Sequence, residues 1–443
     1  MRRRPPRASR HHRNGAHTDP ADREALELTL GEPAHGGACV ARDADGRVVF
    51  VRHGLPGERV RARVTSTRNT LAWADVEEVL EPSPDRVPSV WPQAGPGGVG
   101  GGELAHVRPA AQRRWKSDVL RGQLRRVGGE ELAARVAELG GVEVRPAPGD
   151  EGGDDALLGR RTRIELVIDE GGRPGMHRYR GREVIALDSM PLAVPAVGAL
   201  GLFEDPAWRD LWRAGDRVRV VAPTGGEPVV VTPRGVFDSS RRPVGADPLA
   251  WDVALPDGGR STYGVRPSGF WQTHVRGAEV LAGAVARGAA VGEGTRVAEL
   301  YSGAGLFTRV LADATGPGGR VLSLEGDEEA VADASRNLSG RPWAEPFVGS
   351  VDAEGVGDLT AELGGSADVV VLDPPRAGAG REVTRALVET GTARIVLVAC
   401  DPAAGARDLR ALHEGGYALE SLEAWDLFPH THHLEFVAVL TRS

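Results

Sequence analysis

The sequence lacks several features that define whole classes of protein. Only two of its 443 residues are cysteines, Cys39 and Cys400, so we expect no disulfide framework, and a reducing cytoplasm is the expected compartment. No apolar run approaches the roughly 20 residues that cross a bilayer. The Arg-rich beginning also lacks the apolar stretch of a secretory signal. We therefore expect a cytoplasmic protein without a membrane partner.

Lysine is almost absent as well. Lys116 is the only lysine among 54 basic residues, and the abundance of Arg, Ala, Gly and Val is typical of a GC-rich genome. The net charge of −8 weakly opposes nucleic-acid binding, because affinity for phosphate is mostly electrostatic. Basic residues nevertheless cluster at positions 2–13, 59–68, 108–126, 160–163 and 173–182. This distribution is compatible with a basic RNA-binding face and equally with an ordinary solvated surface.

The length indicates more than one domain. Residues 1–21 have almost nothing to bury and are expected to form a disordered basic arm. Residues 22–81 contain short β-type runs, which predict a small β-barrel. The runs lie at Leu26–Leu30, Gly36–Ala41, Arg47–Val51, Arg59–Val64 and Ala72–Leu80.

The rest of the chain divides into two further regions. Residues 82–258 predict a mixed α+β central domain, with strands at Arg163–Ile168 and Arg217–Val221 and a helix from Pro109 to about Glu138. Part of the basic stretch 108–126 is expected to pack on the following domain. Residues 259–443 alternate between strands and helices, which predicts an α/β domain with a doubly wound, Rossmann-like parallel sheet.

A nucleotide-like cofactor is indicated within this last domain. An apolar strand runs from Thr295 into a turn that contains Gly303 and Gly305, and glycine there permits close approach of a ligand. The next strand ends about 20 residues later at Glu325, where a carboxylate can bind both hydroxyls of a ribose. The sequence has no Gly-x-Gly-x-x-Gly and no Gly-Lys-Ser in this region, so S-adenosylmethionine fits better than NAD.

A thiol follows a later strand of the same domain. The β-branched run that begins at Arg394 ends in Cys400-Asp-Pro, which places a cysteine at the carboxyl edge of the sheet, where such sheets bind ligands. Asp373-Pro-Pro-Arg376 follows the preceding strand and predicts a rigid loop over the pocket. A buried structural cysteine and a simple strand-terminating turn are the alternatives. The histidines near the end lack the spacing of a metal site, so we expect no metal.

These motifs resemble those of a known family. Ala399–Pro402, Asp373–Arg376, Phe270-Trp-Gln272 and Phe428–Glu435 are similar to motifs of the S-adenosylmethionine-dependent RNA 5-methyluridine methyltransferases. The stretch Gly54–Glu58 resembles the TRAM RNA-binding module that many of these enzymes carry. The similarity covers most of residues 22–443, and the C-terminal motifs are its most specific part.

The resemblance implies roles for individual residues. Cys400 would add to C6 of a uracil, and Glu435 would remove the proton from C5. Gln272, Tyr301, Glu325 and Asp373 match cofactor-binding positions of the family, beside the Gly303 and Gly305 turn. The substrate would be structured RNA, either rRNA or tRNA, with an unpaired or loop uridine that can leave the base stack. We expect a monomer.

The sequence also departs from this family. Some relatives carry a four-cysteine iron–sulfur site, but Val99, Gly102 and Met190 stand at positions where cysteines would be, so we expect no cluster. Two other functions remain open. An RNA cytosine-C5 methyltransferase would use two catalytic cysteines, and the C-terminal domain has only Cys400. A non-catalytic RNA-binding paralogue would have no need of Cys400, Glu435 and Gln272.

Overall fold

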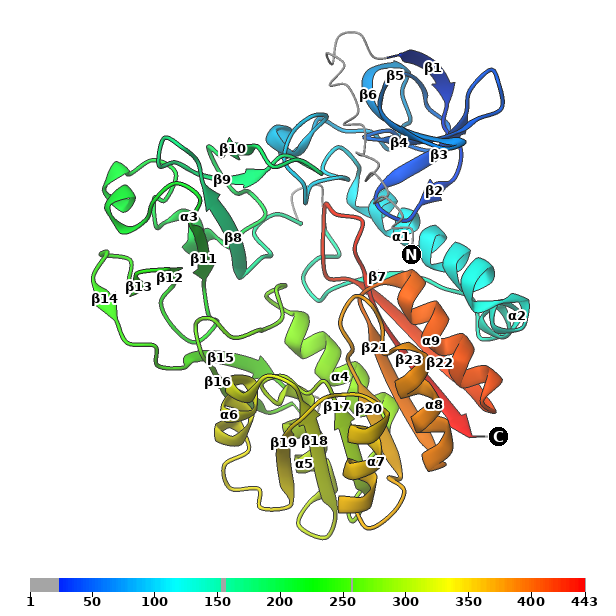
Figure 1. Cartoon of the computed structure of the whole chain (residues 1–443), viewed down its shortest axis with the longest axis vertical. Helices are drawn as coiled ribbons and strands as arrows, with labels where there is room; N and C mark the ends of the chain where they lie inside the picture. Colours follow the sequence, from blue (N-terminus) through cyan, green and yellow to red (C-terminus); the bar gives the residue numbers. More distant parts are fainter. Residues whose placement is uncertain (1–23, 153–156, 256–257, 443) are drawn as a thin grey trace, which may run out of the picture.

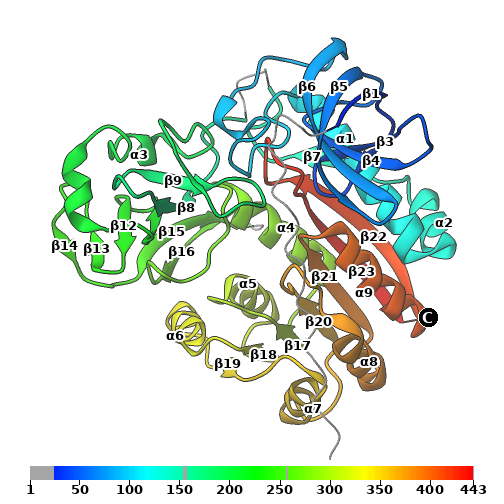
Figure 2. The same cartoon turned by 45° about the horizontal axis from the view of Figure 1, so that its top comes forward.

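The computed structural model describes residues 24–152, 157–255 and 258–442, so the predicted arm of residues 1–21 lies outside the described part. The cyan helices α1 and α2 lie between a small all-β unit (blue) and an α/β unit (yellow to red), and a second sheet (green) lies at the other side of the molecule (Figures 1 and 2). None of the helices within these ranges is long and apolar enough to cross a membrane.

The N-terminal unit is a closed barrel of six strands in the order β1-β5-β6-β4-β3-β2. The strands are β1 (Ala25–Thr29), β2 (Pro33–Ala34), β3 (Ala38–Arg42), β4 (Val48–Arg52), β5 (Arg59–Arg68) and β6 (Leu71–Glu81). The amide of Gly31, just after β1, donates to the carbonyl of Val40 in β3 and closes the barrel (2.8 Å). Alternating residues of β5 point into the core, as its sequence predicts.

The arginines on the outer face of β5 do not form a free basic patch. Ion pairs join Arg59 to Glu81 (3.0 Å), Arg61 to Glu78 (2.5 Å) and Arg63 to Glu77 across the neighbouring strand β6. Opposite charges on adjacent strands stabilise such pairs modestly. The basic cluster at positions 59–68 is therefore largely neutralised on the barrel itself.

The central unit is a seven-stranded antiparallel sheet in the order β10-β9-β8-β11-β12-β13-β14. Its strands are β8 (Arg163–Ile168), β9 (Pro174–His177), β10 (Val184–Ala186), β11 (Arg217–Val221), β12 (Val229–Thr232), β13 (Gly235–Phe237) and β14 (Pro243–Val244). Three short helices accompany it: η2 (Pro92–Ala94), α3 (Pro195–Gly198) and η4 (Pro206–Leu211). The predicted strands at positions 163–168 and 217–221 are confirmed.

The C-terminal unit is built on an eight-stranded sheet in the order β19-β18-β17-β20-β21-β23-β22-β7. Its strands are β17 (Arg296–Leu300), β18 (Arg320–Glu325), β19 (Ala344–Val348), β20 (Val369–Leu372), β21 (Arg394–Ala399), β22 (Tyr417–Asp426), β23 (Glu435–Arg442) and β7 (Val144–Pro146). Strands β17 to β21 are parallel, whereas β23 runs antiparallel to both β21 and β22. The predicted doubly wound α/β fold is confirmed.

Helices cover both faces of this sheet, because successive strand residues point to opposite sides. Val297 and Val369 pack in one apolar cluster with α4 and α5, whereas Ala298 and Val370 pack in another with α7, α8 and α9. The helices are α4 (Gly277–Ala289), α5 (Leu306–Thr315), α6 (Glu328–Asn337), α7 (Ala353–Glu362), α8 (Gly380–Thr390) and α9 (Pro402–Glu414).

The prediction of one continuous helix from Pro109 to about Glu138 is wrong. The chain forms α1 (Pro109–Gln123), a π-helical turn η3 (Leu124–Gly128) and α2 (Glu130–Glu138), with Gly129 at φ 99° between the last two. Leu120 and Leu124 pack in the same apolar cluster as α8 and α9, so the expected packing of this region on the C-terminal unit is confirmed.

Two segments from the predicted central region also join the C-terminal unit. Strand β7 pairs in parallel with β22 at the edge of the large sheet. Strand β15 (Leu249–Ala254) pairs with β16 (Arg260–Val265), so this hairpin spans the predicted boundary at residues 258 and 259. The hairpin residues Trp251 and Tyr263 share an apolar cluster with α4 and α5. The hairpin therefore packs with the sheet that carries the site.

The close packing of α9 generates a stability prediction. A Cβ at Gly405 in α9 would lie 2.3 Å from Cζ of Phe436 and 2.9 Å from Cβ of Ala399, so Gly405→Ala should destabilise the protein by about 1–3 kcal/mol. Gly357 lies in α7 with no atom within 4 Å of its ideal Cβ, so Gly357→Ala should stabilise it by about 0.4–1 kcal/mol. Thermal unfolding of both variants measures these changes in stability. Melting temperatures that shift in the same direction in both variants would contradict the prediction.

Candidate active site

Five of the residues expected in the site lie at one edge of the eight-stranded sheet. Tyr301 follows β17, Glu325 ends β18 and Asp373 follows β20. Cys400 follows β21, and Glu435 begins β23, whose antiparallel direction brings its start to the same edge. The carboxyl edge of a parallel sheet is where open α/β folds bind ligands.

Cys400 and Glu435 are placed together by strand pairing. Ala399 in β21 pairs with Phe436 in β23. Cys400 follows Ala399 and Glu435 precedes Phe436, so the antiparallel register brings the thiol beside the carboxyl group. The Glu435 side chain is buried, and its Oε2 atom has no hydrogen-bond partner in the described part of the chain. Burial raises the pKa of Glu435 well above its usual value, and the nearby Asp373 carboxylate raises it further.

The charges around Cys400 oppose each other. Burial raises the pKa of the Cys400 thiol to about 12, and the neighbouring carboxyl groups of Glu435 and Asp373 contribute to this increase. The guanidinium of Arg376, from the Asp-Pro-Pro-Arg loop, lowers the pKa of the thiol and also that of Glu435. The thiol is therefore protonated at neutral pH in this state, and Arg376 is a cation that favours the thiolate.

The glycine turn after β17 is held by the carboxylate at the end of β18. Glu325 accepts hydrogen bonds from the amides of Gly303 (3.0 Å) and Asp327 (2.9 Å). A Cβ at Gly303 would have no neighbour within 4 Å, so this glycine borders open space that a ligand can approach. A Cβ at Gly305 would lie 3.2 Å from Cβ of Ala334, so Gly305 permits the close packing of α5 on α6.

A hollow of about 440 Å³ lies beside the ends of β18 and β19. Its lining includes Leu324, Phe347, Val348, Gly349, Asp352 and Gly355. Its lining also contains the carboxylates of Glu354, Asp358 and Glu362, so the hollow is acidic as well as apolar. Leu324 directly precedes Glu325, so the hollow borders the strand that ends in this carboxylate.

A second, smaller cavity of about 40 Å³ lies under the Phe-x-Gln loop. It is lined by Phe270, Gln272, Tyr301, Gly303 and Asp373, together with neighbouring residues. Trp271 is buried against Trp251 and Tyr263, with ring centroids 5.7 and 5.3 Å apart, and this packing fixes the loop. The adjacent Phe270 is 69% exposed at the rim of the cavity.

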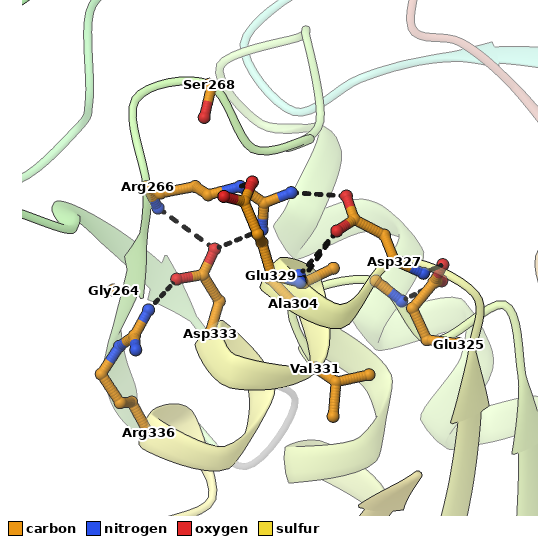
Figure 3. A network of polar contacts seen from close by, with 12 residues as sticks. Gly264, Arg266, Ser268, Ala304, Glu325, Asp327, Glu329, Val331, Asp333 and Arg336 are labelled. Carbon is orange, nitrogen blue, oxygen red and sulfur yellow. Dashed lines mark hydrogen bonds and ion pairs between the residues drawn. The ribbon is translucent and has the colours of Figure 1, made fainter. Parts of the chain in front are cut away.

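Arg266, which precedes Phe270 in the sequence, connects this loop to the segment that follows Glu325 (Figure 3). Arg266 forms ion pairs with Asp327 (2.5 Å), Glu329 (3.0 Å) and Asp333 (3.2 Å). Asp327 caps helix α6, and its own amide donates to Glu325. The network therefore connects the segment that leads to Phe270 with the turn that follows Glu325.

Sequence reasoning did not select three residues of this site. Arg376 lies within the Asp-Pro-Pro-Arg motif, but that motif by itself gives no reason to assign this arginine a role. Glu299 is buried, burial raises its pKa to about 8, and it accepts a hydrogen bond from Thr308 (2.6 Å). The sequence signal that could have identified Glu299 is its position as an acidic residue inside an apolar strand. Arg266 had no comparable signal, because its partners lie more than 60 residues away.

The histidines near the C-terminal end contact other parts of the chain. His432 Nδ1 lies 3.5 Å from Oε2 of Glu103, and His35, from the barrel, lies 3.2 Å from Asp401. His35 thereby connects the barrel to the residue that follows Cys400. Within the ranges that the structure describes, no group of three or more His, Cys, Asp or Glu side chains could hold a metal ion.

The positions where some relatives carry cluster cysteines form part of an apolar core. Val99 and Met190 are buried in one cluster with Trp91. A Cβ at Gly102 would lie 2.6 Å from Cβ of Ala94 and 2.9 Å from the ring of Trp91. The residues present offer no thiolate and leave no space for a side chain at Gly102, so they do not fit an iron–sulfur cluster.

Comparisons with known families match both ends of the chain. Residues 365–443 match the family model described as tRNA (Uracil-5-)-methyltransferase. Residues 22–76 match the model of the TRAM domain. The first match contains Asp373, Cys400 and Glu435, and the second covers most of the barrel.

Relatives of similar length extend the comparison. An uncharacterized RNA methyltransferase of Streptomyces avermitilis is 40% identical over 94% of this chain and 98% of its own length. The 23S rRNA (uracil(1939)-C(5))-methyltransferase RlmD of Halomonas elongata is 31% identical over 94% of this chain and 89% of its own length.

A solved structure has a similar fold. The tRNA (uracil-54, C5)-methyltransferase of Pyrococcus abyssi, in complex with S-adenosyl-L-homocysteine, is similar over 94% of this chain and 99% of its own, with a TM-score of 0.64. The sequences are 22% identical, so this likeness shows the fold alone.

The electrostatics of the thiol generate a prediction about its reactivity. With a pKa of about 12 in place of the usual 9.0, Cys400 should hold about a thousandfold less thiolate at pH 8 than an ordinary cysteine. Its alkylation by iodoacetamide should therefore be slow and should still accelerate above pH 10. Mass spectrometry of the alkylated peptide measures the rate.

Substitutions of neighbouring charges should move this rate in opposite directions. Glu435→Gln removes a carboxyl group that raises the pKa of the thiol and should speed alkylation, whereas Arg376→Gln should slow it. Cys400→Ser, which keeps the fully buried Cys39, is the control and should react negligibly. A wild-type rate that levels off near pH 9 would show that the thiol is not perturbed.

Proposed function

Because this chain belongs to the family of S-adenosylmethionine-dependent RNA (uracil-5-)-methyltransferases, we propose that it methylates C5 of a uridine in structured RNA. The chain is an RNA methyltransferase that uses S-adenosylmethionine, and RNA is its substrate. The observation that supports the finer proposal is the pairing of β21 with β23, which brings a thiol beside a carboxyl group whose Oε2 atom has no hydrogen-bond partner among the described residues.

The cofactor would bind across the ends of β17, β18 and β20. S-adenosylmethionine, when bound, supplies an electrophilic methyl group. Glu325 is the group for the ribose hydroxyls, because each carboxylate oxygen keeps a free lone pair beyond its backbone hydrogen bond. Gln272, Tyr301 and Asp373 line the cavity next to Gly303 and would hold the rest of the cofactor.

Cys400 would activate the target base. C5 of uracil is too weak a carbon nucleophile to take a methyl group unaided. When the Cys400 thiolate forms a bond to C6, the electrons of the C5–C6 double bond move toward the O4 carbonyl, and the resulting enolate makes C5 nucleophilic. Arg376 supports this step, because its positive charge favours the thiolate over the thiol.

Glu435 would complete the reaction as the general base. After C5 has gained the methyl group, its remaining proton must leave so that the C6–S bond can break and the double bond can return. Burial raises the pKa of Glu435, which makes its carboxylate a stronger proton acceptor than an exposed one. Oε2 makes no hydrogen bond within the described ranges, so no protein group competes for the proton.

The RNA would present an extruded uridine. C5 and C6 of a stacked base are out of reach of a side chain at a sheet edge, so the nucleotide must leave the stack. The exposed ring of Phe270 at the rim of the cavity is suited to stack on a base. We propose that the TRAM barrel holds neighbouring RNA, since His35 brings it into contact with Asp401 beside the thiol.

The alternatives fit less well. A cytosine-C5 methyltransferase with two catalytic cysteines would need a second thiol, and Cys39 is fully buried in the barrel. A non-catalytic RNA-binding paralogue would have no reason to keep Cys400, Glu435 and Asp373 at one edge. Uracil C5 is therefore the target we propose, in rRNA or tRNA.

The reaction and its substrate class can be tested in cells. A strain that lacks this gene should lose 5-methyluridine from one RNA fraction, which nucleoside mass spectrometry of separately purified 23S rRNA and tRNA detects. The full-length relatives named for 23S rRNA favour that fraction. Complementation with wild type should restore the nucleoside, and complementation with Cys400→Ala should not. Unchanged 5-methyluridine in both fractions would count against the proposal.

The covalent mechanism predicts trapped intermediates. RNA that contains 5-fluorouridine should form an adduct stable to denaturation with wild type, because fluorine at C5 cannot be removed as a proton. Cys400→Ala should form none while its affinity for S-adenosylhomocysteine stays within about threefold. Glu435→Gln should accumulate an adduct with ordinary RNA on a denaturing gel. If Glu435→Gln yields only free RNA while wild type turns over, the base is another residue.

A further inference from the structure

The segment that delivers Glu435 is held by a helix from a distant part of the sequence. Asp426 ends β22 and residues 427–434 connect it to β23, and Figure 1 shows this red loop reaching up against the cyan region of α1. Figure 2 shows the same contact after rotation. The two regions are more than 300 residues apart in sequence.

Lys116 anchors the beginning of the segment. Its ammonium group donates to Oδ1 of Asp426 (2.5 Å) and to the carbonyl oxygen of Phe428 (3.0 Å). The Lys116 and Asp426 side chains are 0% and 2% exposed. The only lysine of the chain is thus buried in an ion pair rather than displayed to RNA. Burial of both charges is costly, and Oδ2 of Asp426 has no hydrogen-bond partner in the described part of the chain, so the pair is retained at a cost in stability.

Gln112, one helical turn earlier in α1, anchors the middle of the segment. Its Oε1 atom accepts from the amide of His430 (2.7 Å), and its Nε2 lies 3.1 Å from Nδ1 of the same histidine. The amide of Leu104 donates to the carbonyl of His430 (2.9 Å), so both backbone groups of this residue are held. His430 has φ 65°, a conformation that a non-glycine residue adopts only when its surroundings impose it.

These anchors act on Glu435 through the backbone. Glu435 pairs with Trp425 across β22 and β23, and Trp425 directly precedes Asp426. Because Oε2 of Glu435 has no hydrogen bond of its own in the described chain, the position of the carboxyl group depends on its main chain and on packing. A shift of Asp426 or His430 would therefore move the carboxyl group relative to C5 of the base.

We propose that Lys116 and Gln112 are positioning residues that set Glu435 for proton removal. This inference rests on the proposed role of Glu435 as the base. Together with their partners Asp426 and His430, they form a group that we call the clamp. The clamp acts on the second half of the reaction, in which the proton leaves C5. It leaves the attack of Cys400 largely unaffected, because the thiol lies at the end of a different strand, β21.

The test compares two half-reactions in variants of the clamp. Lys116→Met and Gln112→Met remove the anchoring hydrogen bonds at similar side-chain volume. We expect turnover to fall at least about tenfold, with an adduct accumulating on ordinary RNA as in Glu435→Gln. Adduct formation with 5-fluorouridine RNA and affinity for S-adenosylhomocysteine should stay within about threefold. Arg114→Met, which removes an exposed cation from the same helix, is the matched control and should accumulate no adduct.

The outcomes separate this inference from the function it rests on. A purely structural role would lower 5-fluorouridine adduct formation, cofactor affinity and turnover together, and that result would overturn the inference. So would unchanged turnover in both clamp variants. If Glu435→Gln accumulates an adduct and the clamp variants do not, the inference fails alone. If Glu435→Gln accumulates none, the role of Glu435 and the inference fail together.

The single lysine provides an independent check in the whole protein. A reagent specific for amines can modify only the N-terminal amine and Lys116, which peptide mapping resolves. Lys116 should react more than about a hundredfold more slowly than in urea-unfolded chain, because its ammonium group is buried and paired. Gln112→Met should increase this rate if the anchors hold the segment jointly. Rapid modification of Lys116 in the folded wild type would overturn the clamp.

Discussion

The chemistry of this protein depends on the reversed direction of one strand. Strands β17, β18, β20 and β21 are parallel and bring Tyr301, Glu325, Asp373 and Cys400 to a single edge. A last strand parallel to them would begin at the opposite edge. Because β23 pairs antiparallel with β21, its first residue, Glu435, meets the thiol instead. The proposed cofactor contacts, nucleophile and base therefore lie in strand order along one edge.

The electrostatics of this edge raise the proton affinity of its thiol and carboxyl groups. Burial raises the pKa of Cys400 to about 12, that of Asp373 to about 7, and that of Glu435 above its usual value. Each charge that forms here is costly while the site is dry and negative neighbours surround it. The positive charge of Arg376 lowers the pKa of both the Cys400 thiol and Glu435. Such a site is suited to a reaction that makes a thiolate briefly and then accepts a proton on a carboxylate.

Local patterns in the sequence predict most of the elements around the site. The β-branched runs before Cys400 and Asp373 and the glycine turn after β17 lie where periodicity placed them, because strand propensity and turn chemistry are properties of a few adjacent residues. The helix expected to continue to Glu138 breaks at the consecutive glycines Gly128 and Gly129, and Gly129 takes a φ of 99°, which lies outside the helical range. The sequence left the arginines of β5 open as an RNA-binding face or a solvated surface, because their glutamate partners lie on a neighbouring strand.

The order of residues was sufficient to select the thiol, the proposed base and the proposed ribose-binding carboxylate, because each stands in a short motif with a chemical meaning of its own. The tertiary structure alone decided which distant groups support them. Arg266 pairs with Asp333 in α6, the charge of Arg376 lowers the pKa of the Cys400 thiol, and Lys116 pairs with Asp426. Such pairs join residues tens to hundreds of positions apart, and no local pattern encodes them. They form only when folding excludes water and leaves each buried charge to find its partner.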